Sequence, residues 1–152
     1  MITLTPSTDL ASLIGTPLGT GGWLTVDQEL IDGFAALTGD RQWLHTDPER
    51  ARSGPYGATI AHGFLVLSLL PRLAADAVEL SGFASVVNYG LDRVRFPAPV
   101  RAGSRIRDAL SLDSVEETPR GTLLRMTHTI EVEGQDRPGC VAQQLRLLTT
   151  GA

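Results

Sequence analysis

The sequence predicts an α+β domain in which an antiparallel sheet wraps around one central helix. Two features of the hydrophobic pattern lead to this prediction. Residues 61–80 place apolar side chains at helical spacing in a wide stripe, which is typical of a helix that is mostly buried. From residue 84 onward the period changes to two, as in half-buried strands. The length of 152 residues favours a single domain over residues 1–152 with a substantial core.

The first part of the chain is expected to hold a lead-in segment, one short strand and one helix. Residues 1–22 are rich in turn-forming glycines and are predicted as the lead-in. Residues 23–26 predict a brief strand. Asp27 can cap the following helix, and Gly39 is placed to end it. Residues 40–56 are interrupted by proline and glycine and predict an irregular excursion with one short helix.

The rest of the chain is expected to supply the central helix and most of the sheet. The helix is predicted from Ala61 to Leu80, with a kink or local break at Pro71. Clusters of proline, glycine and polar residues then separate four long strands. These strands are predicted at residues 85–96, 104–116, 122–133 and 141–148. An antiparallel sheet of this size can wrap around a single helix.

Composition excludes several classes of function. All 13 basic residues are arginine, so a Schiff-base lysine or a P-loop lysine is excluded. A net charge of −4 argues against binding to nucleic acid. The single cysteine, Cys140, excludes an internal disulfide and multi-cysteine metal sites, and it is expected to be a small buried residue. With no signal peptide or membrane-spanning run in the sequence, a cytoplasmic protein without membrane contact is expected.

Two short segments carry the residues that could do chemistry. Asp40 and His45 follow the helix-ending glycine, and a carboxylate beside an imidazole can perform acid–base catalysis. On spacing alone, Asp40 could simply cap a turn. His62 and Gly63 begin the central helix, where a glycine lets a ligand approach its backbone N–H. The alternative is that Gly63 permits close packing and His62 satisfies a backbone group.

The chain resembles the MaoC-like or (R)-specific enoyl-CoA hydratase family, and within it the small branch of nodulation protein N-like proteins. The resemblance covers nearly the whole chain. It is carried by Asp40-Arg-Gln-Trp-Leu-His45, Gly54-Pro-Tyr-Gly57, Ile60-Ala-His-Gly-Phe64, Leu69-Leu-Pro-Arg-Leu73, Asn88-Tyr-Gly-Leu91 and Val94-Arg-Phe-Pro-Ala-Pro-Val100. The family pattern differs at Gln42, where asparagine is usual, and at Pro71, where some members have a serine near the tunnel.

The resemblance implies a hot-dog fold and a homodimer whose substrate tunnel lies at the subunit interface. It implies that Asp40 and His45 hold a water beside the double bond of a 2-enoyl thioester, carried by CoA or acyl carrier protein. The Gly63 N–H would then bind the thioester carbonyl. No metal and no cofactor beyond the carrier are expected.

Further residues are predicted to line the substrate site in this family. They are Gln42, Trp43, Tyr56, His62, Asn88 and Tyr89. Trp43 could instead anchor a loop, and Tyr89 could instead pack between sheet and helix. His128 has no acidic residue close to it in the sequence, and a structural role is predicted for it.

Three functions remain open at this point. The first is (R)-specific hydration or dehydration of a 2-enoyl thioester. The second is conjugate addition of an amine, or hydrolysis of the thioester, on the same scaffold. The third is a non-enzymatic subunit that only binds acyl thioesters. The presence of both Asp40 and His45 argues against the third, because a binding pocket alone does not need that pair.

Overall fold

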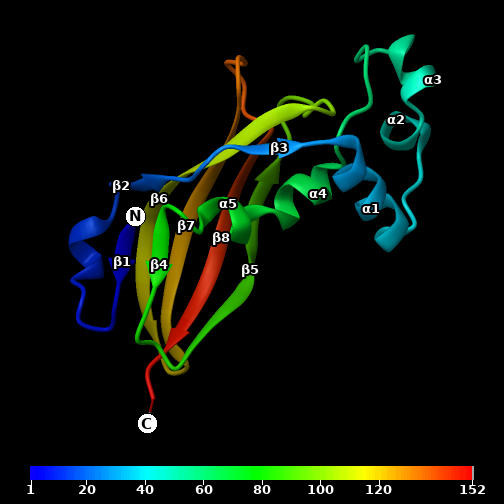
Figure 1. Cartoon of the computed structure of the whole chain (residues 1–152). Helices are drawn as coiled ribbons and strands as arrows, with labels where there is room; N and C mark the ends of the chain where they lie inside the picture. Colours follow the sequence, from blue (N-terminus) through cyan, green and yellow to red (C-terminus); the bar gives the residue numbers. More distant parts are fainter. Residues whose placement is uncertain (152) are drawn as a thin grey trace.

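A strongly curved antiparallel sheet forms most of the molecule (Figure 1). The computed structural model describes residues 1–151. The order of strands is β2–β6–β7–β8–β5, and β3 also pairs with β6. The strands are β2 (Pro17–Thr20), β3 (Leu24–Val26), β5 (Ser85–Arg95), β6 (Ser104–Thr118), β7 (Gly121–Val132) and β8 (Cys140–Thr149). The four long strands lie within two residues of their predicted bounds.

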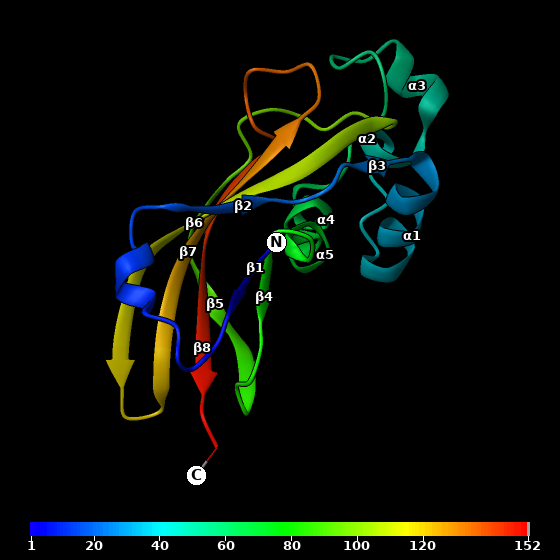
Figure 2. The same cartoon turned by 60° about the vertical axis from the view of Figure 1, so that its left-hand side comes forward.

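The predicted central helix is shorter than expected and is broken in two. It consists of α4 (Gly63–Ser68) and α5 (Leu70–Ala74), and Leu69 is the cap residue of both. Pro71 lies in the first turn of α5, where its missing N–H costs no helical hydrogen bond. The prediction of one helix to Leu80 is therefore wrong, whereas the break predicted near Pro71 is confirmed. The two helices lie across the concave side of the sheet (Figure 2).

Residues 78–80 form a strand instead of a helical end. This strand, β4 (Val78–Leu80), pairs in parallel with β1 (Ile2–Leu4) at the start of the chain. The turn-rich lead-in predicted over residues 1–22 does not precede the first strand, because it contains β1, the 3₁₀ helix η1 (Leu10–Leu13) and β2. The apolar side chains of β1 and β4 close one end of the core.

The segment after β3 is a set of short helices that lies off one end of the sheet, beside α4 (Figures 1 and 2). Its elements are α1 (Gln28–Thr38), α2 (Trp43–Thr46) and α3 (Pro48–Arg52). Asp27 caps α1 by accepting a hydrogen bond from the N–H of Leu30, as predicted. Gly39 ends α1 with a φ of 79°, a left-handed conformation that suits glycine.

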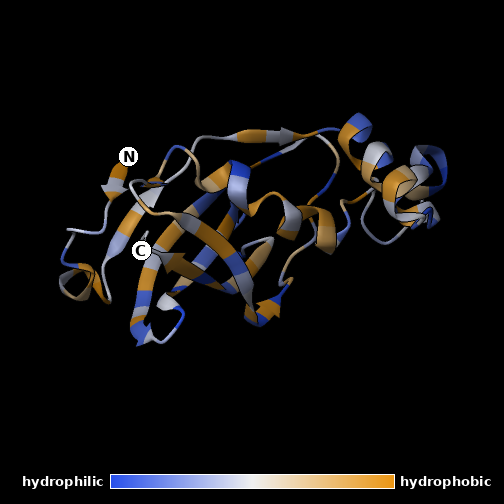
Figure 3. Cartoon of the chain, turned by 90° about the horizontal axis from the view of Figure 1, so that it is seen from below, coloured by the Kyte–Doolittle hydropathy of each residue, from blue (hydrophilic) through white to orange (hydrophobic). Residues whose placement is uncertain are grey.

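Apolar and polar residues alternate along the strands, and this alternation is visible as colour bands in Figure 3. In β7, residues 124, 126, 128, 130 and 132 are all buried, while their neighbours are half-buried. These inward side chains pack against α4 and α5 and form two apolar clusters, one toward each end of the helix pair. No helix within residues 1–151 is long and apolar enough to cross a membrane.

Cys140 is fully buried at the start of β8, and we expect it to be unreactive in the folded protein. Burial, aided by the negative charge of Asp108, raises the pKa of its thiol from 9.0 to about 11. Since the thiolate is the reactive form, a thiol reagent at pH 8 should modify Cys140 only after denaturant is added. The raised pKa also implies that this thiol's contribution to stability is present below pH 9 and is lost as pH rises toward 11. Rapid modification of the native protein at pH 8 would contradict this.

Candidate active site

Asp40, His45 and His62 meet at the junction between the α1–α3 segment and α4. Asp40 directly follows the left-handed Gly39, His45 lies in α2, and His62 is the residue before α4. One polar atom from each of the three side chains lies within 4.8 Å of the other two. The two histidines are buried, and Asp40 is exposed. Asp40 and His45 are thus close to each other, although no hydrogen bond joins their side chains within residues 1–151.

Hydrogen bonds fix the orientation of the His45 ring. Its Nδ1–H donates to the backbone oxygen of Ile60 at 2.7 Å, because a carbonyl oxygen can only accept. In the neutral ring this leaves Nε2 as a free acceptor, which is the state that a general base requires. Gln28 donates to the backbone oxygen of His45 at 2.7 Å, and the hydroxyl of Thr59 donates to Gln28 in turn.

Gln28 and Thr59 are positioning residues that the sequence analysis missed. They hold the backbone of His45 but do not belong to the motif that contains it. A glutamine in the first turn of a helix is common on surfaces, so the residue type gives no signal. Their contact joins residues 31 positions apart in the sequence, and only the folded structure reveals it.

His62 contacts both Asp40 and His45. Its Nε2–H donates to the backbone oxygen of Asp40 at 2.9 Å, and its ring stacks on that of His45 with centroids 3.7 Å apart. Phe34 packs on the His62 ring with centroids 5.1 Å apart. The Nδ1 atom of His62 is buried and has no hydrogen-bond partner within residues 1–151. His62 thus satisfies a backbone group, which was the alternative to substrate contact.

Gly63 is the first residue of α4, and its N–H has no acceptor within residues 1–151. A Cβ atom at this position would lie 2.9 Å from the ring of Phe96, so glycine is also needed for packing. The packing role of Gly63 is therefore present in the structure, and the N–H that the ligand-binding role requires is unpaired within residues 1–151. Because α4 has only six residues, the useful feature is this single free N–H rather than the dipole of a long helix.

His45, Gly63 and Tyr56 line one hollow of about 350 Å³. Its other walls come from α4 and from the loop that follows β5, including Val66, Phe96 and Val100. The lining of this hollow is mostly apolar, which suits an apolar ligand group. Tyr56, which was predicted at the substrate site, thus lines the same hollow as His45 and Gly63.

Four other predicted substrate residues lie away from this hollow. Gln42 is exposed and precedes α2, and Trp43 packs against Gly54 and under Arg50, as a loop anchor does. Tyr89 projects from β5 and accepts a hydrogen bond from Arg120 at 3.1 Å. Asn88 lies next to Pro71, in a separate hollow between α5 and β5. None of these four side chains lines the hollow at His45 and Gly63.

The three grouped side chains do not fit a metal ion. Ligand nitrogens lie about 2.0–2.1 Å from Zn²⁺, with each imidazole pointing its lone pair at the ion. The rings of His45 and His62 are stacked with an interplanar angle of 24°, so their lone pairs lie in nearly parallel planes. Two such nitrogens cannot converge on one ion without unstacking the rings.

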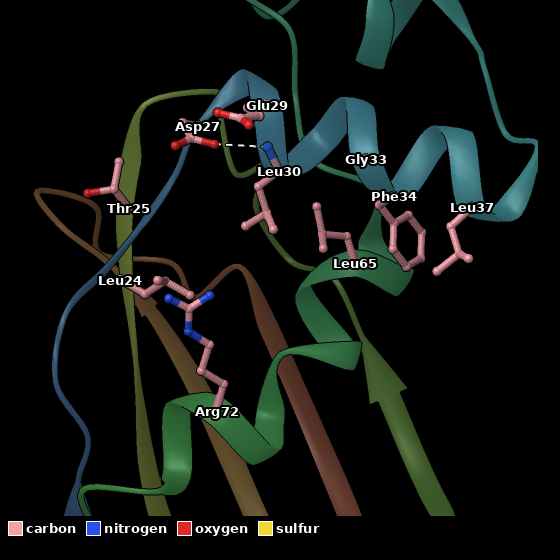
Figure 4. Close-up of a pocket in the computed structure, with 10 residues that line it drawn as sticks. All are labelled: Leu24, Thr25, Asp27, Glu29, Leu30, Gly33, Phe34, Leu37, Leu65 and Arg72. Carbon is pink, nitrogen blue, oxygen red and sulfur yellow. Dashed lines mark hydrogen bonds between the residues drawn. The ribbon is translucent and has the colours of Figure 1, made fainter.

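A larger hollow of about 510 Å³ lies on the other side of α4, between α1 and β3 (Figure 4). Leu30, Phe34 and Leu65 give it an apolar floor, and Arg72 reaches toward it from α5. Asp27 at its rim is engaged in capping α1. Neither Asp40 nor His45 lines this hollow, whereas His45 lines the smaller one.

A curved antiparallel sheet around a short helical core is the hot-dog fold, and comparison with known proteins identifies the class. The R-hydratase PhaJ1 from Pseudomonas aeruginosa superimposes with a TM-score of 0.73 at 21% identity, over 91% of this chain and 83% of that one. The "3-hydroxyacyl-thioester dehydratase Z" of Mycobacterium tuberculosis is 49% identical over 138 residues, which cover 90% of this chain and 91% of that protein. "Nodulation protein N" of Rhizobium leguminosarum bv. viciae is 43% identical over 92% of this chain and 89% of its own.

The fold and these relatives define an enzyme of the hydratase–dehydratase type. A family model for the MaoC like domain matches residues 9–133. The chain belongs to the MaoC-like family, and the resemblance seen in the sequence is confirmed.

Proposed function

We propose that the protein adds water reversibly across the double bond of a 2-enoyl thioester, giving the (R)-3-hydroxyacyl thioester. The observation that carries this proposal is that His45, with its free Nε2, and Gly63, with its free N–H, line one hollow, while a carboxylate oxygen of Asp40 lies within 4.8 Å of a His45 ring nitrogen. The names of the relatives, a 3-hydroxyacyl-thioester dehydratase and an R-hydratase, support the same reaction.

Each of these groups has a part in the reaction. Asp40 and His45 hold a water and remove one of its protons as its oxygen bonds to the β-carbon. The electrons of the double bond then move toward the thioester, and negative charge develops on its oxygen. The Gly63 N–H stabilises that charge, and the dyad returns a proton to the α-carbon. The proposal assigns these proton transfers to the pair and not to one of the two residues.

The reaction needs no cofactor besides the CoA or acyl carrier protein that bears the acyl group. Water, a proton and a polarised carbonyl are the only participants, and the chain's own residues supply the acid, the base and the N–H donor. The same groups could also direct an amine to the β-carbon or water to the carbonyl, so an assay has to separate these reactions.

An assay with crotonyl-CoA distinguishes these three reactions from one another and from binding without turnover. Hydration should remove the enone absorbance without releasing free thiol. Release of thiol would instead establish thioester hydrolysis, and loss of absorbance only after an amine is added would establish conjugate addition. Binding of crotonyl-CoA without any turnover would leave only the acyl-binding role and would overturn the proposal.

We also propose a homodimer formed through β5. This strand pairs with β8 on one edge only within residues 1–151. It exposes apolar side chains that are 40–48% accessible, namely Val86, Val87, Tyr89, Leu91 and nearby Phe96. A long apolar edge of this kind recruits another strand, and a second copy of β5 fits it by symmetry.

Replacing Val87 by lysine should convert the dimer to a monomer. The charge would lie on the unpaired edge, where lysine blocks strand pairing. Sedimentation velocity should give a dimer for the wild type and for the control Val87→Thr, which keeps a β-branched side chain. A wild-type monomer, or a dimer that survives in Val87→Lys, would contradict the proposed interface.

A further inference from the structure

Asp40 and His45 act as a pair in the proposed reaction, yet their side chains do not hold each other in place. No hydrogen bond joins them within residues 1–151, and the Asp40 carboxylate accepts none from any other residue in this range. The N–H of Asp40 donates to Thr38 Oγ1 at 3.4 Å, and its carbonyl oxygen accepts from His62. A misplacement of about 1 Å can cost about 100-fold in rate. The arrangement of the pair therefore needs a further contact.

His62 makes a contact with each member of the pair. Its Nε2–H donates to the Asp40 carbonyl oxygen at 2.9 Å, which fixes the backbone from which the carboxylate projects. Its ring stacks on the His45 ring, with centroids 3.7 Å apart and an angle of 24° between the planes. The hydrogen bond from His45 Nδ1 to Ile60 leaves the His45 ring free to tilt about that bond. The stacked ring of His62 removes this freedom.

The third group of the proposed reaction is joined to His62 through the chain. The Gly63 N–H belongs to the peptide group between residues 62 and 63, which is planar and rigid. The Ile60 carbonyl that orients His45 lies two residues earlier in the same segment. Residues 60–63 thus carry the N–H donor, the acceptor for His45 and the ring that contacts both members of the pair.

His62 is itself held in one place. It is 3% exposed, and the Phe34 ring, which projects from α1 toward α4 (Figure 4), packs on it with centroids 5.1 Å apart. Packing alone does not account for a histidine here, because its Nδ1 is buried and has no partner within residues 1–151, which is unfavourable. His62 also does not line the hollow at His45 and Gly63, so a role in the reaction has to act through its neighbours.

We propose that His62 is a positioning residue, which holds the Asp40 carboxylate, the His45 ring and the Gly63 N–H in one arrangement around the substrate. This inference rests on the proposed function, because it takes these three groups as the reacting ones. His62 exchanges no proton with water or substrate. Its loss should therefore weaken stabilisation of the transition state while leaving substrate binding nearly unchanged.

Two single substitutions separate the two contacts of His62. His62→Phe keeps a flat ring against His45 but cannot donate to the Asp40 carbonyl. His62→Gln keeps a donor, because the amide nitrogen of glutamine reaches nearly the same position as Nε2, but it has no ring to stack. Each should lower kcat for crotonyl-CoA by about tenfold, and His62→Ala, which loses both contacts, by about 100-fold.

The division of the effect between kcat and KM distinguishes positioning from substrate contact. For all three variants, KM for crotonyl-CoA and the dissociation constant of saturated butanoyl-CoA should stay within about twofold of the wild type. A rise in both constants with kcat unchanged would make His62 a substrate-binding residue and would overturn the inference. So would a kcat within about twofold of the wild type in both His62→Phe and His62→Gln.

A core substitution away from the site controls for loss of stability. Leu18 is 6% exposed and belongs to the apolar cluster that contains neither Ala61 nor Leu65, the buried neighbours of His62 in the sequence. Leu18→Ala leaves a cavity and lowers Tm. It should nevertheless keep kcat within about twofold at a temperature where all variants are folded. A fall in kcat for Leu18→Ala as large as that for His62→Ala would attribute the effect to stability and overturn the inference.

Crystal structures of the wild type and of His62→Ala test the arrangement without turnover. In the variant, the His45 ring should tilt by more than about 20°, or the Asp40 carbonyl should shift by more than about 0.5 Å, the tolerance of a catalytic arrangement. If His62→Ala does not fold, the same comparison is made with His62→Gln. Unchanged positions would overturn the inference even if the wild type hydrates crotonyl-CoA. If the wild type hydrates no enoyl-CoA, the proposed function fails, and the positioning role is decided by these structures alone.

Discussion

Replacing Asp40 by asparagine should lower kcat/KM for crotonyl-CoA by at least about 100-fold, and His45→Ala should do the same. Asparagine keeps the shape of the side chain but cannot take a proton from water. Alanine removes the Nε2 acceptor that the contact between Nδ1 and Ile60 leaves free. The measurement is the initial rate of enone loss at several substrate concentrations.

The loss should not come from unfolding. Asp40 is exposed, and the hydrogen bond from His62 goes to its backbone oxygen, which the substitution leaves in place. Asp47→Asn is a matched control from the same segment, because asparagine can also cap α3 in the way that Asp47 does. The control should stay within about twofold of the wild type. A loss below about tenfold in both Asp40→Asn and His45→Ala would count against the dyad.

Replacing His128 by alanine should have the largest effect on stability. It would leave the Asp108 carboxylate at 0% exposure without the one hydrogen-bonded side chain that it has among residues 1–151. Removing one member of a buried ion pair costs about 3–5 kcal/mol of unfolding free energy. For a chain of this size that corresponds to a fall in Tm of roughly 10 °C or more, measurable by calorimetry.

An exposed ion pair provides the comparison. Arg105 and Glu133 are joined at 2.8 Å, but about half of each side chain is accessible. Arg105→Ala should therefore cost no more than about 1 kcal/mol. The double variant Asp108→Leu/His128→Leu should recover much of the stability that His128→Ala loses, since no charge remains buried. Equal losses of unfolding free energy in His128→Ala and Arg105→Ala would show that the buried pair contributes no more to stability than the exposed pair.

Local sequence signals predicted the parts of the site that lie close together in the chain. The cap at Asp27, the left-handed Gly39 and the five-residue step from Asp40 to His45 belong to one continuous segment. Turn residues likewise marked the ends of the four long strands, because period-two patterns stop where proline and glycine begin. These features depend on neighbouring residues, which a sequence displays directly.

Features that depend on distant residues were not predicted. Residues 78–80 continue the apolar pattern of the helix, but pairing with β1 at the start of the chain makes them a strand. His128 has no acid nearby in sequence, yet the pairing of β6 with β7 brings Asp108 to its ring. The brace from Thr59 through Gln28 to His45 is also a contact between separate segments. Such contacts require the register of the folded strands and the path of the loops.

The configuration of the hydration product tests the central claim most directly. Purified protein is incubated with crotonyl-CoA, and the 3-hydroxybutyryl-CoA formed is resolved by chiral chromatography while free thiol is titrated in parallel. The account predicts the (R) product, no free thiol, and loss of product formation in Asp40→Asn. An (S) product, a racemic product, or thiol released in step with the loss of crotonyl-CoA would contradict it.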